Sequence, residues 1–169
     1  MKLFAYGSNM LLERIKVRAP DAVRVDIGHI SGMDFEYNKI GRRKNGTHSG
    51  KANMETCEGG VVWGVIYSMP DDQFETINVL EKGYSPMDVL IQSEANGKIH
   101  CKTFVAEDVN TDESLRPYHW YKDLVLAGAA QNGLPVDYIH QIVEITSDPD
   151  PGGDKYRDAR EARKILDNI

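Results

Sequence analysis

The segment Tyr6-Gly7-Ser8-Asn9 is the first part of the chain whose residue types and spacing could do chemistry. It follows a short run of strand-forming residues and precedes apolar residues at helical spacing. Gly-Ser-Asn at such a junction exposes backbone amides near the positive end of a helix dipole, where a carboxylate or oxyanion binds well. Ser8 or Asn9 would also suit the N-cap of the helix. The segment therefore predicts an anion cradle, although any capped strand-to-helix turn has the same pattern.

Glu81 is the second candidate, a carboxylate at the end of a predicted helix that begins at Met69-Pro70-Asp71. We expect Phe74, Ile77 and Leu80 to form the inward face of this helix. A carboxylate that ends such a helix beside a pocket can accept a proton and return it. A lone glutamate at a helix C-terminus is more often a solvated charge, and periodicity alone does not decide between the two.

The sequence lacks the motifs of several other familiar types of site. Ser8 does not lie in a G-x-S-x-G elbow, and the chain contains neither H-E-x-x-H nor G-x-x-x-x-G-K-[ST]. Cys57 and Cys101 have no C-x-x-C spacing, which predicts reduced thiols. The histidines stand apart from cysteines and carboxylates at metal-ligand spacing, and they are His29, His48, His100, His119 and His140. We therefore expect neither a metal nor a cofactor.

The composition is that of an acidic globular protein. Its 169 residues predict one domain, 1–148, followed by a linker and a charged C-terminal helix at 149–169. The net charge of -6 argues against a nucleic-acid-binding protein, which normally presents a basic surface. No apolar run suits a membrane span or a signal peptide. We expect a soluble, cytoplasmic protein without nucleic-acid or membrane partners.

The middle of the chain is predicted to be rich in β-strands, and these strands must position the candidate residues. Strands are predicted where β-branched and aromatic residues alternate or run together, at 3–6, 22–27, 33–37, 61–67, 89–91 and 99–105. Asn96-Gly97 between the last two is a strong hairpin signal. Residues 38–60 are polar and glycine-rich, which predicts a long mobile connection that could act as a lid.

Helices complete the predicted fold. From residue 117 onwards one helical face consists of Tyr121, Leu124, Val125 and Gly128. Asn132-Gly133 ends this helix, and Pro135 suits the start of the next. A linker follows at 149–153, and a charged helix begins at Lys155. Strands with inserted and appended helices predict an α+β fold.

Several segments together resemble the γ-glutamylcyclotransferase family. They stand in the family's order and are 4–11, 59–67, 77–81, 121–122 and 128–135. Residues 4–11 are similar to the family's opening signature, and Val-Trp-Gly-Val within 59–67 is typical of its central strand. Ile77, Asn78 and Glu81 are similar to the leucine, aspartate and catalytic glutamate of the family pattern.

The resemblance implies a small, mostly antiparallel β-barrel flanked by helices, and a cyclising enzyme that acts on a small γ-glutamyl substrate without a cofactor. The substrate's own α-amine attacks its γ-carbonyl carbon, forms 5-oxoproline and expels the attached amine. Glu81 would move the proton in this reaction. The amides of Gly7, Ser8 and Asn9 would hold the α-carboxylate or the developing oxyanion. Tyr6 and Tyr121 would line the pocket, although each could equally be a core aromatic.

Two departures from the family pattern bear on the substrate. Lys82 separates Glu81 from Gly83, where relatives usually have glycine directly after the glutamate. Met87-Asp88 stands where relatives tend to have an aromatic residue, usually tyrosine. We expect an aspartate near the mouth of the pocket to alter its charge and the substrate preference.

Three functions stay open from the sequence. The first is γ-glutamylcyclotransferase activity, and the second is a related activity on a γ-glutamylamine or on a γ-glutamyl group of a larger metabolite. The third is a non-catalytic small-molecule binding module that keeps the anion-binding loop. The oligomeric state, monomer or homodimer, is also open.

Overall fold

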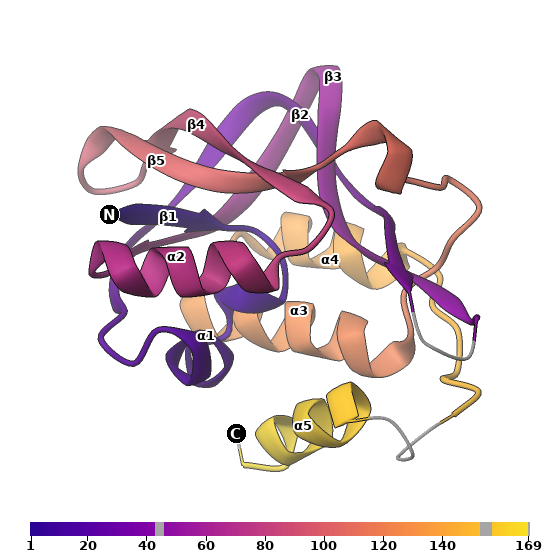
Figure 1. Ribbon diagram of the computed structural model, residues 1–169. Helices are drawn as coiled ribbons and strands as arrows, with labels where there is room; N and C mark the ends of the chain where they lie inside the picture. Colours follow the sequence, from indigo (N-terminus) through magenta and orange to yellow (C-terminus); the bar gives the residue numbers. More distant parts are fainter. Residues whose placement is uncertain (43–45, 153–156, 169) are drawn as a thin grey trace.

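The computed structural model describes residues 1–42, 46–152 and 157–168. In these ranges a five-stranded barrel is flanked by helices (Figure 1). The strands are β1 (Lys2–Ala5), β2 (Val23–Arg42), β3 (His48–Ser68), β4 (Tyr84–Ser93) and β5 (Gly97–Ala106). The helices are α1 (Leu12–Arg18), α2 (Asp71–Leu80), α3 (His119–Asn132), α4 (Val136–Glu144) and α5 (Arg157–Leu166), with short 3-10 turns η1 (Ser8–Met10) and η2 (Asp108–Asn110).

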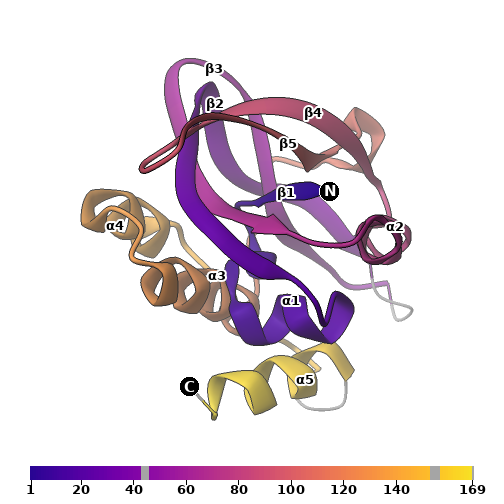
Figure 2. The same ribbon diagram turned by 90° about the vertical axis from the view of Figure 1, so that its left-hand side faces the viewer.

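The barrel closes in the strand order β1-β3-β2-β4-β5. Four of its pairings are antiparallel, and closure comes from a parallel contact in which Leu3 of β1 lies beside Lys102 of β5. Figure 2 shows the strands curving around this closed wall, with α1 and α3 beneath it. The predicted α+β fold with a mostly antiparallel barrel is confirmed.

The long hairpin of β2 and β3 corrects several predictions. The strands expected at 22–27 and 33–37 are parts of one strand, β2. Residues 38–42 and 48–60, expected in a long mobile connection, are paired in β2 and β3. The prediction of a long connection without secondary structure is therefore wrong for these residues, and residues 43–45 lie outside the described ranges.

The residues that predicted a loop are used inside this hairpin. A Cβ on Gly50 would lie 1.8 Å from the carbonyl oxygen of Tyr37, so only glycine allows the strands to approach here. Gly32 has φ +79, which suits the register shift beside it. Asn38 and Asn53 are buried, and the Asn53 amide donates to Asn38 Oδ1 at 3.0 Å. Glycine and asparagine thus mark close packing and a buried polar pair rather than a loop.

Position 81, rather than position 80 as expected, continues the inward face of helix α2. Phe74 and Ile77 are fully buried as predicted, but the expectation that Leu80 faces inward is wrong, because it is 54% exposed. At 3.6 residues per turn, position 81 lies closer than position 80 to the face of Phe74 and Ile77. The helix ends at Leu80, and the Glu81 amide still donates to the Ile77 carbonyl.

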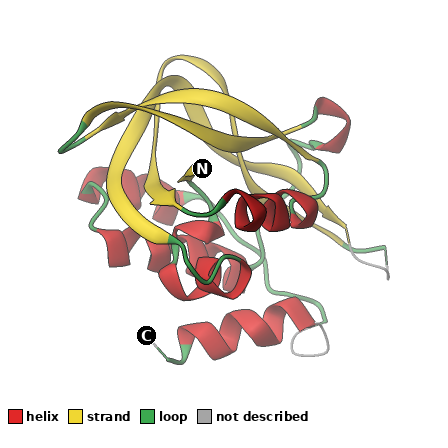
Figure 3. Ribbon diagram, turned by 60° about the vertical axis from the view of Figure 1, so that its left-hand side comes forward, coloured by secondary structure: helices red, strands yellow, loops and turns green. Residues whose placement is uncertain are grey.

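The C-terminal helices agree with the sequence pattern more closely. Helix α3 ends at Gly133, which has the left-handed conformation (φ 72), and α4 follows directly after Pro135. The predicted start of the last helix, Lys155, lies outside the described residues. In Figure 3, α5 lies under the other helices. Its Ala162 packs with Leu11 and Leu124. The division of the chain at 148/149 stays a prediction.

The barrel and the helices α1 to α4 share one apolar core, and Ala162 of α5 belongs to a second, smaller cluster. The shared core includes β1, the centre of β3 and the inward faces of α2 and α3. Both cysteines, Cys57 and Cys101, are free thiols. None of the described helices combines the length and the apolar character needed to cross a membrane.

Candidate active site

The segment Tyr6–Asn9 lies directly after β1 and leads into the turn η1. The Met10 amide donates to the Gly7 carbonyl at 2.9 Å, which starts the turn. Because the turn begins at Ser8, the amides of its first residues lack helical acceptors. The predicted capping role is wrong, because the N-cap residues are Gly7 for η1 and Leu11 for α1.

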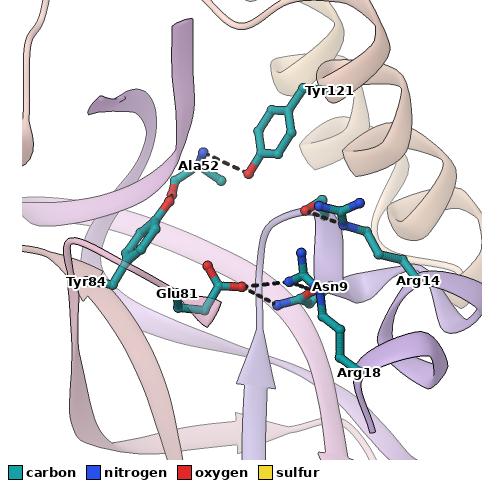
Figure 4. Close-up of polar contacts among 8 residues, drawn as sticks. Asn9, Arg14, Arg18, Ala52, Glu81, Tyr84 and Tyr121 are labelled. Carbon is teal, nitrogen blue, oxygen red and sulfur yellow. Dashed lines mark hydrogen bonds and ion pairs between the residues drawn. The ribbon is translucent and has the colours of Figure 1, made fainter. Parts of the chain in front are cut away.

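The two polar side chains of this loop bind other parts of the site instead. Ser8 Oγ accepts a hydrogen bond from Arg14 Nε at 3.0 Å. Asn9 Nδ2 donates to Glu81 Oε1 at 3.0 Å, and Asn9 Oδ1 accepts from Arg18 Nη1 at 2.8 Å. Figure 4 shows α1 presenting both arginines to the loop. The loop is therefore fixed by side chains from α1 and from the end of α2.

Glu81 is held through one of its two carboxylate oxygens. Oε1 accepts from Asn9 and, at 2.8 Å, from Arg18 Nη1, in an ion pair whose side chains are about one-fifth exposed. In the described part of the chain, nothing donates to Oε2, which points away from this pair (Figure 4). Such a carboxylate is fixed in place and has one oxygen available for a proton.

Two tyrosine hydroxyls meet at one edge of β3. Tyr84 OH donates to the Ala52 carbonyl at 2.6 Å, and the Ala52 amide donates to Tyr121 OH at 3.1 Å (Figure 4). Tyr6 OH donates to the Phe104 carbonyl, and both residues line the cavity. Tyr6 and Tyr121 are both buried, so each is at once a core aromatic and a wall.

All three tyrosines remain protonated at neutral pH. Burial raises the pKa of Tyr6 and of Tyr84 well above the ordinary value, and burial also raises the pKa of Tyr121. They can therefore donate hydrogen bonds but cannot serve as bases. The Tyr121 hydroxyl accepts from Ala52 and still carries a proton of its own to donate.

The structure brings all six predicted site residues to one cavity of about 50 Å³, and these are Tyr6, Gly7, Ser8, Asn9, Glu81 and Tyr121. Among the described residues that line it, Glu81 is the only carboxylate. No three His, Cys, Asp or Glu side chains gather in the described ranges where they could hold a metal ion. The cavity thus combines one carboxylate and several neutral hydrogen-bond donors with a loop at the start of the turn η1.

The prediction about Asp88 is wrong. Its side chain is 83% exposed, and it forms an ion pair with Lys102 across β4 and β5 at 2.9 Å. Asp88 does not line the cavity, because alternation along β4 turns it to the solvent side. Tyr84, three residues after Glu81, supplies an aromatic wall instead.

Sequence reasoning missed Arg14, Arg18, Tyr84 and Ala52. A usable signal existed for the arginines, which are four residues apart and therefore share a face of the helix that follows the loop. For Ala52 no signal existed, because its backbone rather than its side chain makes the contacts.

Tyr84 and Tyr37 form a matched pair for testing the tyrosine wall. Tyr84→Phe removes the donor to a backbone carbonyl, so we expect a loss of about 1–3 kcal/mol in the free energy of unfolding. The Tyr37 hydroxyl is buried and has no hydrogen-bond partner among the described residues, so Tyr37→Phe is expected to be neutral or stabilising. Urea unfolding of both variants measures the difference, and equal losses would contradict this assignment of the hydroxyls.

Known proteins share this fold and sequence. Residues 61–142 match the AIG2-like family. γ-Glutamylcyclotransferase from Bos taurus is 31% identical over 140 residues, which cover 80% of this chain and 73% of that protein. The Homo sapiens protein of the same name is 30% identical over 147 residues, 84% of this chain and 77% of its own length. A solved structure named γ-glutamyl cyclotransferase has the same fold, with a TM-score of 0.85 at 24% identity over 99% of this chain and 98% of that one. The chain therefore belongs to the γ-glutamylcyclotransferase family.

Proposed function

We propose that the protein is a γ-glutamylcyclotransferase, which converts a γ-glutamyl compound into 5-oxoproline and a free amine. The observation that carries the proposal is the position of Glu81. It is the only carboxylate among the described residues lining the cavity, and one of its oxygens is tied to Asn9 and Arg18 while the other is available. Family membership supports the same activity.

The proton balance of this reaction requires one base that also acts as an acid. Glu81 takes a proton from the substrate's α-ammonium, and the resulting amine attacks the γ-carbonyl carbon to form a tetrahedral intermediate. Glu81 then returns the proton to the leaving nitrogen as its bond to the carbonyl carbon breaks. The ring nitrogen still carries one proton too many, and Glu81 takes this second proton and passes it to the released amine, which leaves as an ammonium. Atoms and charge balance without water, a metal or a cofactor.

The other residues would hold the substrate for this step. The amides of Gly7, Ser8 and Asn9 bind its α-carboxylate or the developing oxyanion, and Arg14 holds Ser8 in the loop. Tyr121 donates a hydrogen bond into the same space, and Tyr6 forms another part of the cavity wall. Holding nucleophile and carbonyl in one geometry lowers the barrier by itself.

Mass detection of 5-oxoproline tests this function. The purified protein is incubated with a γ-glutamyl amino acid, a γ-glutamylamine and glutathione. We expect 5-oxoproline from at least one of them, and the substrate that yields it separates the related activities. Binding of all three compounds without any 5-oxoproline would reject the enzyme and favour a binding module.

A further inference from the structure

Lys39 and Lys51 lie directly opposite each other on β2 and β3. Like charges at opposed positions of an antiparallel pair repel and destabilise the sheet. The protein as a whole carries a net charge of -6, so this pair opposes its overall charge. Because this placement of two positive charges is unfavourable for the sheet, we expect the pair to have a function.

Each ammonium lies over the ring of a tyrosine that lines the cavity, and neither lysine is itself among the lining residues. Lys39 Nζ is 4.8 Å from the centre of the Tyr84 ring, and Lys51 Nζ is 4.0 Å from the centre of the Tyr121 ring. Lys51 Nζ also lies 4.2 Å from the Trp120 ring centre. Cation–π contacts hold both ammonium groups in place beside the site.

The surroundings of Lys39 favour an added anion. Burial lowers the pKa of Lys39, Glu81 raises it, and Arg42 lowers it further. The Glu81 carboxylate is already bound to Arg18 and Asn9. A ligand carboxylate placed near Lys39 would stabilise the ammonium form, which burial and Arg42 disfavour.

We propose that Lys39 and Lys51 form a subsite for a carboxylate carried by the amine that leaves the substrate. This inference rests on the proposed cyclotransferase function. The Tyr6–Asn9 loop serves the γ-glutamyl end, whereas the two lysines flank the walls formed by Tyr84 and Tyr121 on the β2–β3 side. The pair selects amines that bear a carboxylate over neutral amines and over cationic amines, which it repels.

Two substrates that differ in one group isolate this subsite. γ-Glutamylalanine and γ-glutamylethylamide release alanine and ethylamine, which differ only by a carboxylate. The readout is the ratio of kcat/KM for the first substrate to that for the second. We expect the wild type to prefer γ-glutamylalanine, and Lys39→Met or Lys51→Met to lower the ratio about tenfold or more each.

Two further variants keep the test specific. Lys51→Arg retains the charge and is expected to retain most of the ratio. Lys98→Met is the matched control, because Lys98 is an exposed lysine at the β4–β5 hairpin, and it should leave the ratio unchanged. The subsite is overturned if the Met variants leave the ratio unchanged. An equal loss of kcat/KM on both substrates is one such result, and it would place the lysines at the γ-glutamyl end.

Titration calorimetry separates a failure of the subsite from a failure of the proposed function. If neither compound yields 5-oxoproline, the cyclotransferase proposal fails, and affinity replaces turnover as the readout. The wild type should then bind γ-glutamylalanine about tenfold or more tightly than γ-glutamylethylamide, and Lys39→Met/Lys51→Met should abolish the difference. Equal affinities in the wild type overturn the subsite.

Discussion

Glu81→Gln is expected to lower kcat by about 10²–10⁴-fold while the substrate still binds, because the change removes the base and keeps the shape. The amide oxygen can still accept from Asn9 and Arg18, so the loop should stay in place. The measurement is the initial rate of 5-oxoproline formation, with affinity for the substrate followed by titration calorimetry.

Glu75→Gln is the matched control on the same helix. Glu75 is exposed on α2 and accepts from Asn78, away from the cavity, so its variant should keep the wild-type rate. A folded Glu81→Gln protein that forms 5-oxoproline at nearly the wild-type rate would remove Glu81 from the mechanism.

Gly128→Ala is expected to be destabilising, by about 1–3 kcal/mol, although glycine to alanine inside a helix normally stabilises by about 0.5–1 kcal/mol. The added Cβ would lie 2.6 Å from the Leu11 amide nitrogen and 2.8 Å from Met10 Cβ, so the turn η1 or helix α3 must shift. Because a displacement of about 1 Å in a catalytic site can cost on the order of 10²-fold, we also expect kcat/KM to fall by about that factor.

Ala130→Leu provides the comparison within α3. Ala130 is exposed, so a larger side chain there should leave both stability and kcat/KM close to the wild type. Thermal unfolding and initial rates of the two variants are the measurements. A Gly128→Ala protein that is more stable than the wild type and fully active would show that α3 does not position the loop.

The parts of the fold with local signals were predictable. Helical periodicity and the helix-ending residues Asn132-Gly133 predicted the position of α3 closely. Asn96-Gly97 predicted the turn between β4 and β5. The hairpin of β2 and β3 was not predictable in the same way. Its glycines and buried asparagines serve contacts between strands, and single-sequence patterns contain no information about the partner strand.

The site was predictable only in pieces. Asn9 and Glu81 are 72 residues apart, and no local pattern joins them, so their association came from resemblance alone. Arg18 shows why the rest could not be found: its role depends on where the end of α2 lies relative to α1. The prediction about Asp88 was wrong for a related reason. The side of the sheet on which its side chain lies depends on the register of β4 against β5.

The contacts that hold the Tyr6–Asn9 loop also set an order of assembly during synthesis. Leu3 closes the barrel against Lys102, and the Met10 carbonyl accepts from Asn132, which is 122 residues later in the chain. At about 5–20 residues per second, the ribosome needs roughly 6–24 s to reach Asn132 after Met10. These N-terminal residues are therefore made well before Lys102 and Asn132, the partners that complete their contacts. We expect a nascent chain that stops before α3 to lack the Tyr121 wall and the Asn132 contact, and therefore to have an incomplete cavity.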